Sequence, residues 1–296
     1  MGSASRSERQ ADEASAKDSR APAGWRSALW PTLAYLIYWQ AAPRVRDERI
    51  GTVVLSTLVS LVLVVVLAAS YGRAVRSLRA ALALTVCATV AAVPLRLMVA
   101  MGKPMAPWSW LLSVAGLADL AFIALGAGLG ILLSRLIRSA NMVPPVAAVL
   151  ALVDVWTVTL GGPVHQIMES EAPAAQRVAE AMTVKLPTTT AGAAPIAVVG
   201  FADFLFIAFF VAAMCRFAGE REGFARTVWP LSVVLGLYML VVLITGWRMP
   251  ALVPMAVVVV AAHWRRFRYS RSEAFALLYA AILVAAIVGA GAFLRR

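Results

Sequence analysis

Three aspartates lie within long apolar runs, whereas the rest of the 15 acidic residues lie in polar tails and loops. They are Asp119, Asp154 and Asp203. A carboxylate held at the centre of a bilayer costs at least about 2.5 kcal/mol, so it is normally functional or firmly bonded. Each of the three therefore needs a chemical or structural reason.

Asp154 and Asp203 are expected in consecutive, antiparallel helices at 142–164 and 193–217. At 1.5 Å per residue, Asp154 lies about 18 Å from one membrane face and Asp203 about 15 Å from the other. In a core about 30 Å thick these depths nearly coincide. Two such carboxyls can share one proton, so that one activates a water while the other polarises a carbonyl. Alternatively, each is a protonated acid bonded to a hydroxyl or a backbone carbonyl.

The composition of the chain indicates what kind of protein holds these three aspartates. Apolar residues make up 61% of the 296 and charged residues 14%, with a mean hydropathy of +0.82. A soluble domain is about half apolar and a quarter charged, so an ordinary soluble enzyme is excluded. The net charge of +12 does not indicate a nucleic-acid partner, because the basic residues lie mostly in short gaps between apolar runs. The same composition excludes a disulfide scaffold, and Cys87 and Cys215, in apolar runs far apart in sequence, do not indicate a redox compartment.

Residues 1–25 are rich in serine, alanine and charge, and we expect a flexible polar tail there. No apolar stretch of the secretory type follows closely. Residues 26–296 are predicted to form one transmembrane domain of helices, because lipid offers the backbone no hydrogen-bond partner. The nine predicted spans are 27–42, 52–71, 80–101, 109–136, 142–164, 193–217, 227–247, 249–264 and 272–294. The fold class is thus an all-α polytopic membrane helix bundle.

The distribution of lysine and arginine predicts an orientation for nine spans. With the N-terminus inside, the inside segments hold 17 of these residues and the outside segments 9. This excess favours the N-terminus inside and the C-terminus outside. The loop 165–192 would then lie outside.

Three short motifs share the spacing of a known family. They are Val153-Asp154, Gly200-Phe201-Ala202-Asp203 and Pro250-Ala251-Leu252, with 49 residues from Asp154 to Asp203 and 47 from Asp203 to Pro250. The set resembles the presenilin and signal-peptide-peptidase family of intramembrane aspartyl proteases, over about residues 110–264. The Gly-Pro pair and the glutamate-containing run after Asp154 look more like presenilin.

The resemblance implies a presenilin-like fold that hydrolyses peptide bonds of single-span membrane proteins or peptides. It implies catalytic roles for Asp154 and Asp203, with no metal and no cofactor. It also implies substrate-binding roles for Gly200, Phe201, Ala202, Pro250, Ala251 and Leu252.

Several features depart from the family pattern, among them Val153 where tyrosine is common. Ala202 replaces a second glycine and adds a methyl group where a substrate backbone would approach. Presenilin keeps the loop between its aspartates on the cytosolic side, opposite to the orientation from charge, so sidedness stays open. Pro250 lacks an N–H and is expected to leave nearby backbone groups free for an extended substrate.

Asp119 lies in a partial repeat of the second motif. Residues 114–125 read VAGLADLAFIAL and residues 198–209 read VVGFADFLFIAF. Asp119 either belongs to a duplicated element or, as is favoured, is a third acid near the pair or a chance match between two sequences drawn from few apolar residue types. His165 and His263 lie near span ends, where a solvated interfacial histidine is expected.

Two further functions fit the same residues. A proton-coupled transporter or channel would use all three aspartates as relays. A proteolytically inactive, presenilin-like protein would bind helices without cutting them. The sparse cysteines and arginine-rich loops favour a prokaryotic cell membrane, while substrate and oligomeric state leave no trace in the sequence.

Overall fold

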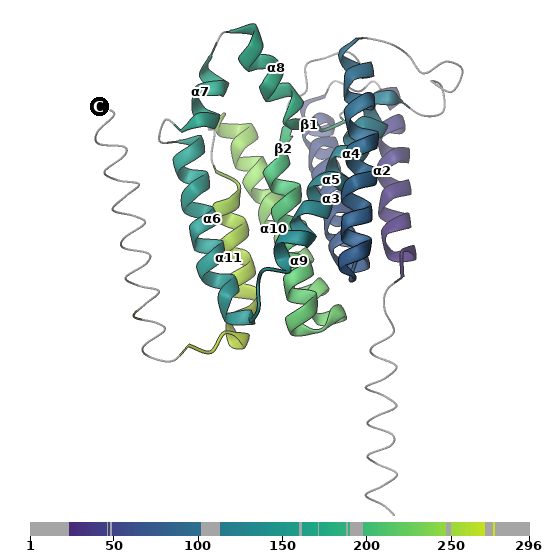
Figure 1. The fold of residues 1–296 in the computed structure, drawn as a ribbon. Helices are drawn as coiled ribbons and strands as arrows, with labels where there is room; N and C mark the ends of the chain where they lie inside the picture. Colours follow the sequence, from purple (N-terminus) through teal and green to yellow (C-terminus); the bar gives the residue numbers. More distant parts are fainter. Residues whose placement is uncertain are drawn as a thin grey trace, which may run out of the picture.

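The structure is a computed structural model of the chain. It describes residues 24–45, 47, 49–101, 113–159, 162–170, 172–187, 189, 198–246, 250–269 and 275. The predicted tail at 1–25 and the predicted ninth span at 272–294 fall almost wholly outside these residues. The order of elements and the shape of the bundle are shown in Figure 1.

The described chain is an all-α membrane helix bundle. Six helices are long and apolar enough to cross a membrane: α3 (Ile50–Ala74), α4 (Leu78–Ala100), α5 (Val114–Ser134), α6 (Val143–Val158, continuous with a 3-10 turn from Ala140), α9 (Phe201–Ala218) and α10 (Glu220–Thr245). The first and eighth predicted spans correspond to α2 (Arg26–Val45) and α11 (Leu252–His263), which do not meet that criterion. The protein is therefore a multi-pass membrane protein.

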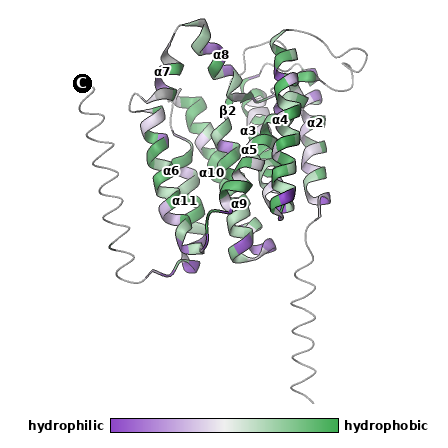
Figure 2. Cartoon of the chain, in the orientation of Figure 1, coloured by the Kyte–Doolittle hydropathy of each residue, from purple (hydrophilic) through white to green (hydrophobic). Residues whose placement is uncertain are grey.

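The apolar helices expose much of their apolar surface. In α4 and α6 only 11% of the most apolar window is buried within the protein. Such surface is unfavourable in water and suits contact with lipid tails. Figure 2 shows apolar residues along the helices and many hydrophilic residues at their ends.

The helix α9 forms the centre of the bundle, against α3, α5 and α10. Small residues allow its backbone to approach its neighbours closely. A Cβ added to Gly130 of α5 would lie 2.0 Å from the carbonyl oxygen of Leu205, and one added to Gly72 of α3 would lie 2.9 Å from that of Ala208. Glycine at helix contacts is typical of membrane bundles, where packing replaces the hydrophobic effect.

A tight turn at Gly219, which has a φ of 86°, joins α9 to α10. The helix α6 packs mainly on α11, and α11 in turn packs on α10. The α6–α11 pair thus lies on one side of the bundle and the α2–α5 group on the other (Figure 1).

The end where α3, α5, α9 and α11 finish carries many arginines, and we call it the basic end. They are Arg73, Arg76, Arg79, Arg135, Arg138, Arg216, Arg221, Arg226, Arg265, Arg266 and Arg268. The opposite end carries α7 (Pro163–Glu169), α8 (Pro173–Ala181) and a two-stranded antiparallel hairpin, β1 (Thr183–Lys185) with β2 (Val198–Gly200).

Two predicted helix boundaries were wrong. The helix predicted at 142–164 ends at Val158, and a separate helix begins at Pro163, because proline starts a helix well but interrupts one. The helix predicted at 193–217 begins only at Phe201, since residues 198–200 pair with β1 as a strand. Apolar character alone does not distinguish a buried strand from a helix turn.

Candidate functional site

Asp154 lies near the end of α6 and faces the start of α11. Its Oδ2 accepts a 2.8 Å hydrogen bond from the backbone N–H of Leu252. Leu252 is the first residue of α11, and the N–H groups of a first helical turn have no partner within their own helix. The carboxyl of Asp154 therefore satisfies a helix N-terminus that comes 98 residues later in the chain.

Asp203 lies in the first turn of α9, directly after strand β2. Its Oδ2 accepts a 3.0 Å hydrogen bond from the backbone N–H of Gly200, the residue that caps the helix. This is half of the reciprocal arrangement in which an acidic residue bonds back to the start of its helix. Asp203 is thus not ten residues deep within a helix, as the sequence suggested, but at the junction of a strand and a helix.

The two carboxyls and the phenol of Tyr238 lie within electrostatic range of one another. The three groups come from α6, α9 and α10. A tyrosine in an apolar run is common in membrane helices, so the sequence offered no signal for Tyr238. The arrangement brings together two carboxyls, each able to carry a proton, and a phenol that can donate a hydrogen bond.

Two of the predicted substrate-binding residues, Gly200 and Leu252, bond to the two carboxyls, and the other four are their neighbours in sequence. Gly200 and Pro250 are half-buried, and Ala202 is exposed on the first turn of α9. Phe201 packs against Phe122 of α5, with ring centroids 4.9 Å apart. The methyl group of Ala202 therefore faces outward rather than into the protein core.

Pro250 was expected to leave nearby backbone groups without partners, and this expectation was wrong for the N–H of Leu252. Pro250 and Ala251 precede α11, and the N–H of Leu252 is bonded to Asp154. The Pro-Ala-Leu segment thus holds an aspartate in place through this N–H. The sequence predicted that the segment and the aspartate would lie close together but did not predict this bond.

Asp119 has a different environment. Its Oδ1 lies 3.1 Å from Nη2 of Arg96 on α4, in an ion pair whose side chains are 11% and 23% exposed. Buried charges are tolerated when they are paired, so the pair explains why both residues lie inside apolar helices. Asp119 is the counter-ion of Arg96, a role that the sequence analysis did not consider.

Arg96 also contacts the hairpin region. Its Nη1 donates to the backbone carbonyl oxygens of Thr183, at 3.0 Å, and Glu180, at 3.3 Å. Its guanidinium lies 4.3 Å from the ring centroid of Phe122, which packs on Phe201. The Arg96–Asp119 pair therefore supports the start of β1 and one wall of the site beside Asp203.

Two carboxyls within electrostatic range of each other are groups of the kind that general acid–base chemistry uses. Two backbone elements accompany the cluster: the edge of strand β2 and the first turn of α11. No protein-family model, curated protein or solved structure matches this chain.

Proposed function

We propose that the protein is a presenilin-like intramembrane aspartyl protease that hydrolyses peptide bonds of single-span membrane helices. The observation that carries the proposal is the hydrogen bond from Leu252 to Asp154, with Asp203 in electrostatic range. It supports the proposal because it joins all three motifs of the resemblance in one region, although they lie far apart in the chain.

In this proposal Asp154 and Asp203 share one proton and hold one water between them. The ionised carboxylate removes a proton from the water, and the protonated carboxyl donates to the oxygen of the scissile carbonyl. The tetrahedral intermediate collapses when its nitrogen accepts a proton and leaves as an amine. The residues of the chain supply every proton transfer in this sequence.

Strand β2 supports an extended binding mode for the substrate. A helix protects its peptide bonds within hydrogen bonds, so a substrate must unwind before water attacks, and its backbone then needs new partners. Among the described residues, β2 pairs with β1 along one edge, and β2 leads through Gly200 directly to Asp203. An unwound substrate that adds a strand to β2 satisfies its backbone and presents a peptide bond to the carboxyls.

The contacts of Asp119 favour proteolysis over transport. A relay of three membrane acids requires Asp119 to exchange protons with the other two, whereas its carboxyl pairs with Arg96 at 3.1 Å and the charged neighbour of Asp203 is Asp154. An inactive helix-binding protein is the alternative if Ala202 prevents the substrate from approaching. We also propose nine spans and a prokaryotic cell membrane, with segment 272–294 as the last span.

The test is cleavage of single-span peptides by the purified chain in detergent, with mass spectrometry of the products. The parent should release two fragments whose masses sum to the substrate plus one water. Asp154→Ala and Asp203→Ala should each abolish cutting. Asp47→Asn, a carboxyl in the loop before α3, is the matched control and should cut at the parental rate. Equal cutting by the parent and both site variants would disprove the proposal.

A further inference from the structure

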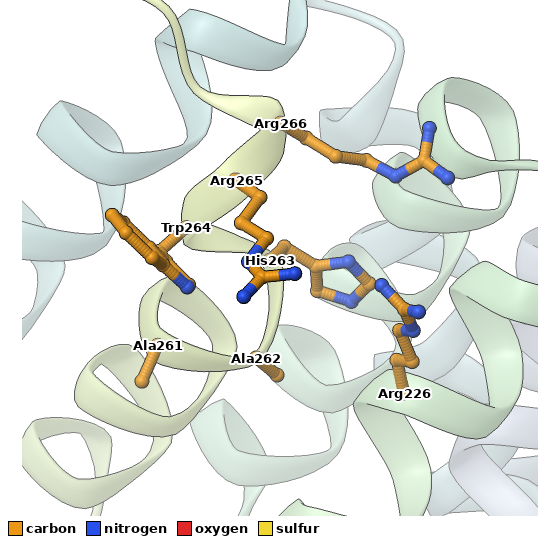
Figure 3. Close-up of a pocket in the computed structure, with 7 residues that line it drawn as sticks. All are labelled: Arg226, Ala261, Ala262, His263, Trp264, Arg265 and Arg266. Atoms are coloured by element: carbon orange, nitrogen blue, oxygen red, sulfur yellow. The ribbon is translucent and has the colours of Figure 1, made fainter.

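A cavity of about 240 Å³ opens at the basic end, between the start of α10 and the end of α11. Arg226, Arg265, Arg266 and His263 line it, together with Trp264, Ala261 and Ala262 (Figure 3). α11 carries Leu252 at its other end, about 17 Å away at helical rise, so the cavity is distinct from the aspartate cluster.

The cavity carries an excess of positive charge. Arg226 lies 2.9 Å from Glu222, and Arg266 pairs with the same carboxylate. Arg265 makes no ion pair within the described part of the chain and lies over the ring of Trp264, 5.9 Å from its centroid. Two of the three guanidinium groups thus share one carboxylate and the third has none, which leaves the site suited to an anion.

His263 contributes a buried polar atom that lacks a partner. Its side chain is 1% exposed, so the expectation of a solvated interfacial histidine was wrong for this residue. Its Nε2 lies 3.0 Å from Oγ1 of Thr227, and that hydroxyl donates its hydrogen to the carbonyl of Gly223. Nε2 therefore carries the hydrogen that Thr227 accepts, and Nδ1 is the acceptor without a partner among the described residues.

The position of the cavity identifies the source of the anion. Trp264 is 65% exposed beside the arginines, at a helix end where the apolar surface stops. Tryptophan and arginine together are typical of the membrane–water interface, at the depth of lipid phosphates. Ala261 and Ala262 give the cavity a side without charge, which suits the glycerol and upper acyl region of a lipid better than a hydrated ion.

We propose that this cavity binds the headgroup of an anionic phospholipid. Arg265 and Arg226 bind the phosphate. In the view of Figure 3, the imidazole of His263 lies between the guanidinium groups of these two arginines, and all three residues line the same cavity. The inference does not depend on proteolysis.

The test is native mass spectrometry of the full chain in detergent, titrated with phosphatidylglycerol, phosphatidylcholine or free glycerol phosphate. The parent should retain phosphatidylglycerol in preference to phosphatidylcholine. Arg265→Gln should weaken retention about tenfold, as expected for the loss of one charge-assisted hydrogen bond. Ala262→Leu, which fills the cavity without changing the charge, should weaken it similarly.

The control is Arg221→Gln, which removes an exposed arginine of the same end that does not line the cavity. It should bind phosphatidylglycerol within about twofold of the parent. Equal losses in Arg221→Gln and Arg265→Gln would overturn the proposal in favour of non-specific attraction by the basic end. Glycerol phosphate that binds as tightly as the lipid would overturn the assignment to a lipid.

Discussion

The backbone N–H of Leu252 donates a 2.8 Å hydrogen bond to Oδ2 of Asp154 and so links the start of α11 to the end of α6. α6 packs mainly on α11, so this bond is a major polar tether of an otherwise apolar contact. In the proposed protease the bond orients one catalytic carboxyl. The bond also gives Asp154 a structural role, which substitutions of this residue can separate from its chemical role.

Asp154→Asn and Asp154→Ala should differ in stability but not in activity. The amide oxygen of asparagine can still accept from Leu252, whereas alanine leaves that N–H without a partner, at a cost of about 1–2 kcal/mol. Both variants should be inactive, and thermal unfolding in detergent should place the alanine variant clearly below the asparagine variant. Identical melting temperatures would show that the bond contributes nothing to stability.

Tyr238→Phe should lower kcat by about tenfold and leave KM nearly unchanged. The phenol lies near both carboxyls, so we expect its hydroxyl to help position the water or the carbonyl oxygen rather than to bind the substrate. Steady-state kinetics on one cleaved peptide measures both parameters. A rise in KM at constant kcat would instead assign Tyr238 to substrate binding.

Ala202→Gly should raise kcat/KM, because it removes an exposed methyl group beside Asp203 where an extended substrate approaches. Glycine in a helix costs about 0.5–1 kcal/mol of stability, so the control is Ala83→Gly, at an exposed position of α4. Both variants should lose similar stability, and only Ala202→Gly should gain activity. Equal activity in the two would mean that the substrate does not pass Ala202.

Apolar runs predicted most of the bundle, because lipid makes a helix the only way to pair the backbone of a long apolar segment. The centres of α3, α4, α5, α9 and α10 were predicted correctly on that basis. The start of α9 was not, since strand β2 depends on its partner β1, which lies twelve or more residues earlier in a polar loop. Tertiary pairing of this kind leaves no periodic signal in a three-residue strand.

The candidate site was predicted in part. The spacing of the motifs predicted that Asp154, Asp203 and the Pro-Ala-Leu segment would lie close together. It did not predict Tyr238, nor the ion pair of Arg96 with Asp119, because neither residue of the pair carries any mark of the other in sequence. Long-range partners of this type become visible only when the helices are packed.

Breaking the Arg96–Asp119 pair from one side should destabilise the protein more than replacing both residues. Asp119→Leu leaves a buried guanidinium without its counter-ion, at a cost of up to about 3 kcal/mol. The double variant Arg96→Met with Asp119→Leu removes both charges and should recover much of that loss. Thermal unfolding of the two single variants and the double variant gives the coupling energy, and additive losses would contradict a direct ion pair.

Because Arg96 also supports the hairpin, the stable double variant offers a second readout. Its Nη1 bonds to the carbonyl oxygen of Thr183 are lost, so β1 should become less protected from amide hydrogen exchange. Activity should fall with it, through the position of β2 rather than through the aspartates. Unchanged amide hydrogen exchange at Thr183–Lys185 would show that Arg96 does not stabilise the hairpin.

The central claim is that Asp154 and Asp203 act as a pair on one tetrahedral intermediate. A peptide isostere with a hydroxyl in place of the scissile carbonyl mimics that intermediate, and it should bind the parent far more tightly than the matching substrate. Binding to the detergent-purified chain, measured by competition with a labelled isostere, should fall by about a hundredfold or more in both Asp154→Asn and Asp203→Asn, and not in Asp47→Asn. If either site variant bound the isostere with the affinity of the parent, the claim that the two aspartates act as a pair would be contradicted.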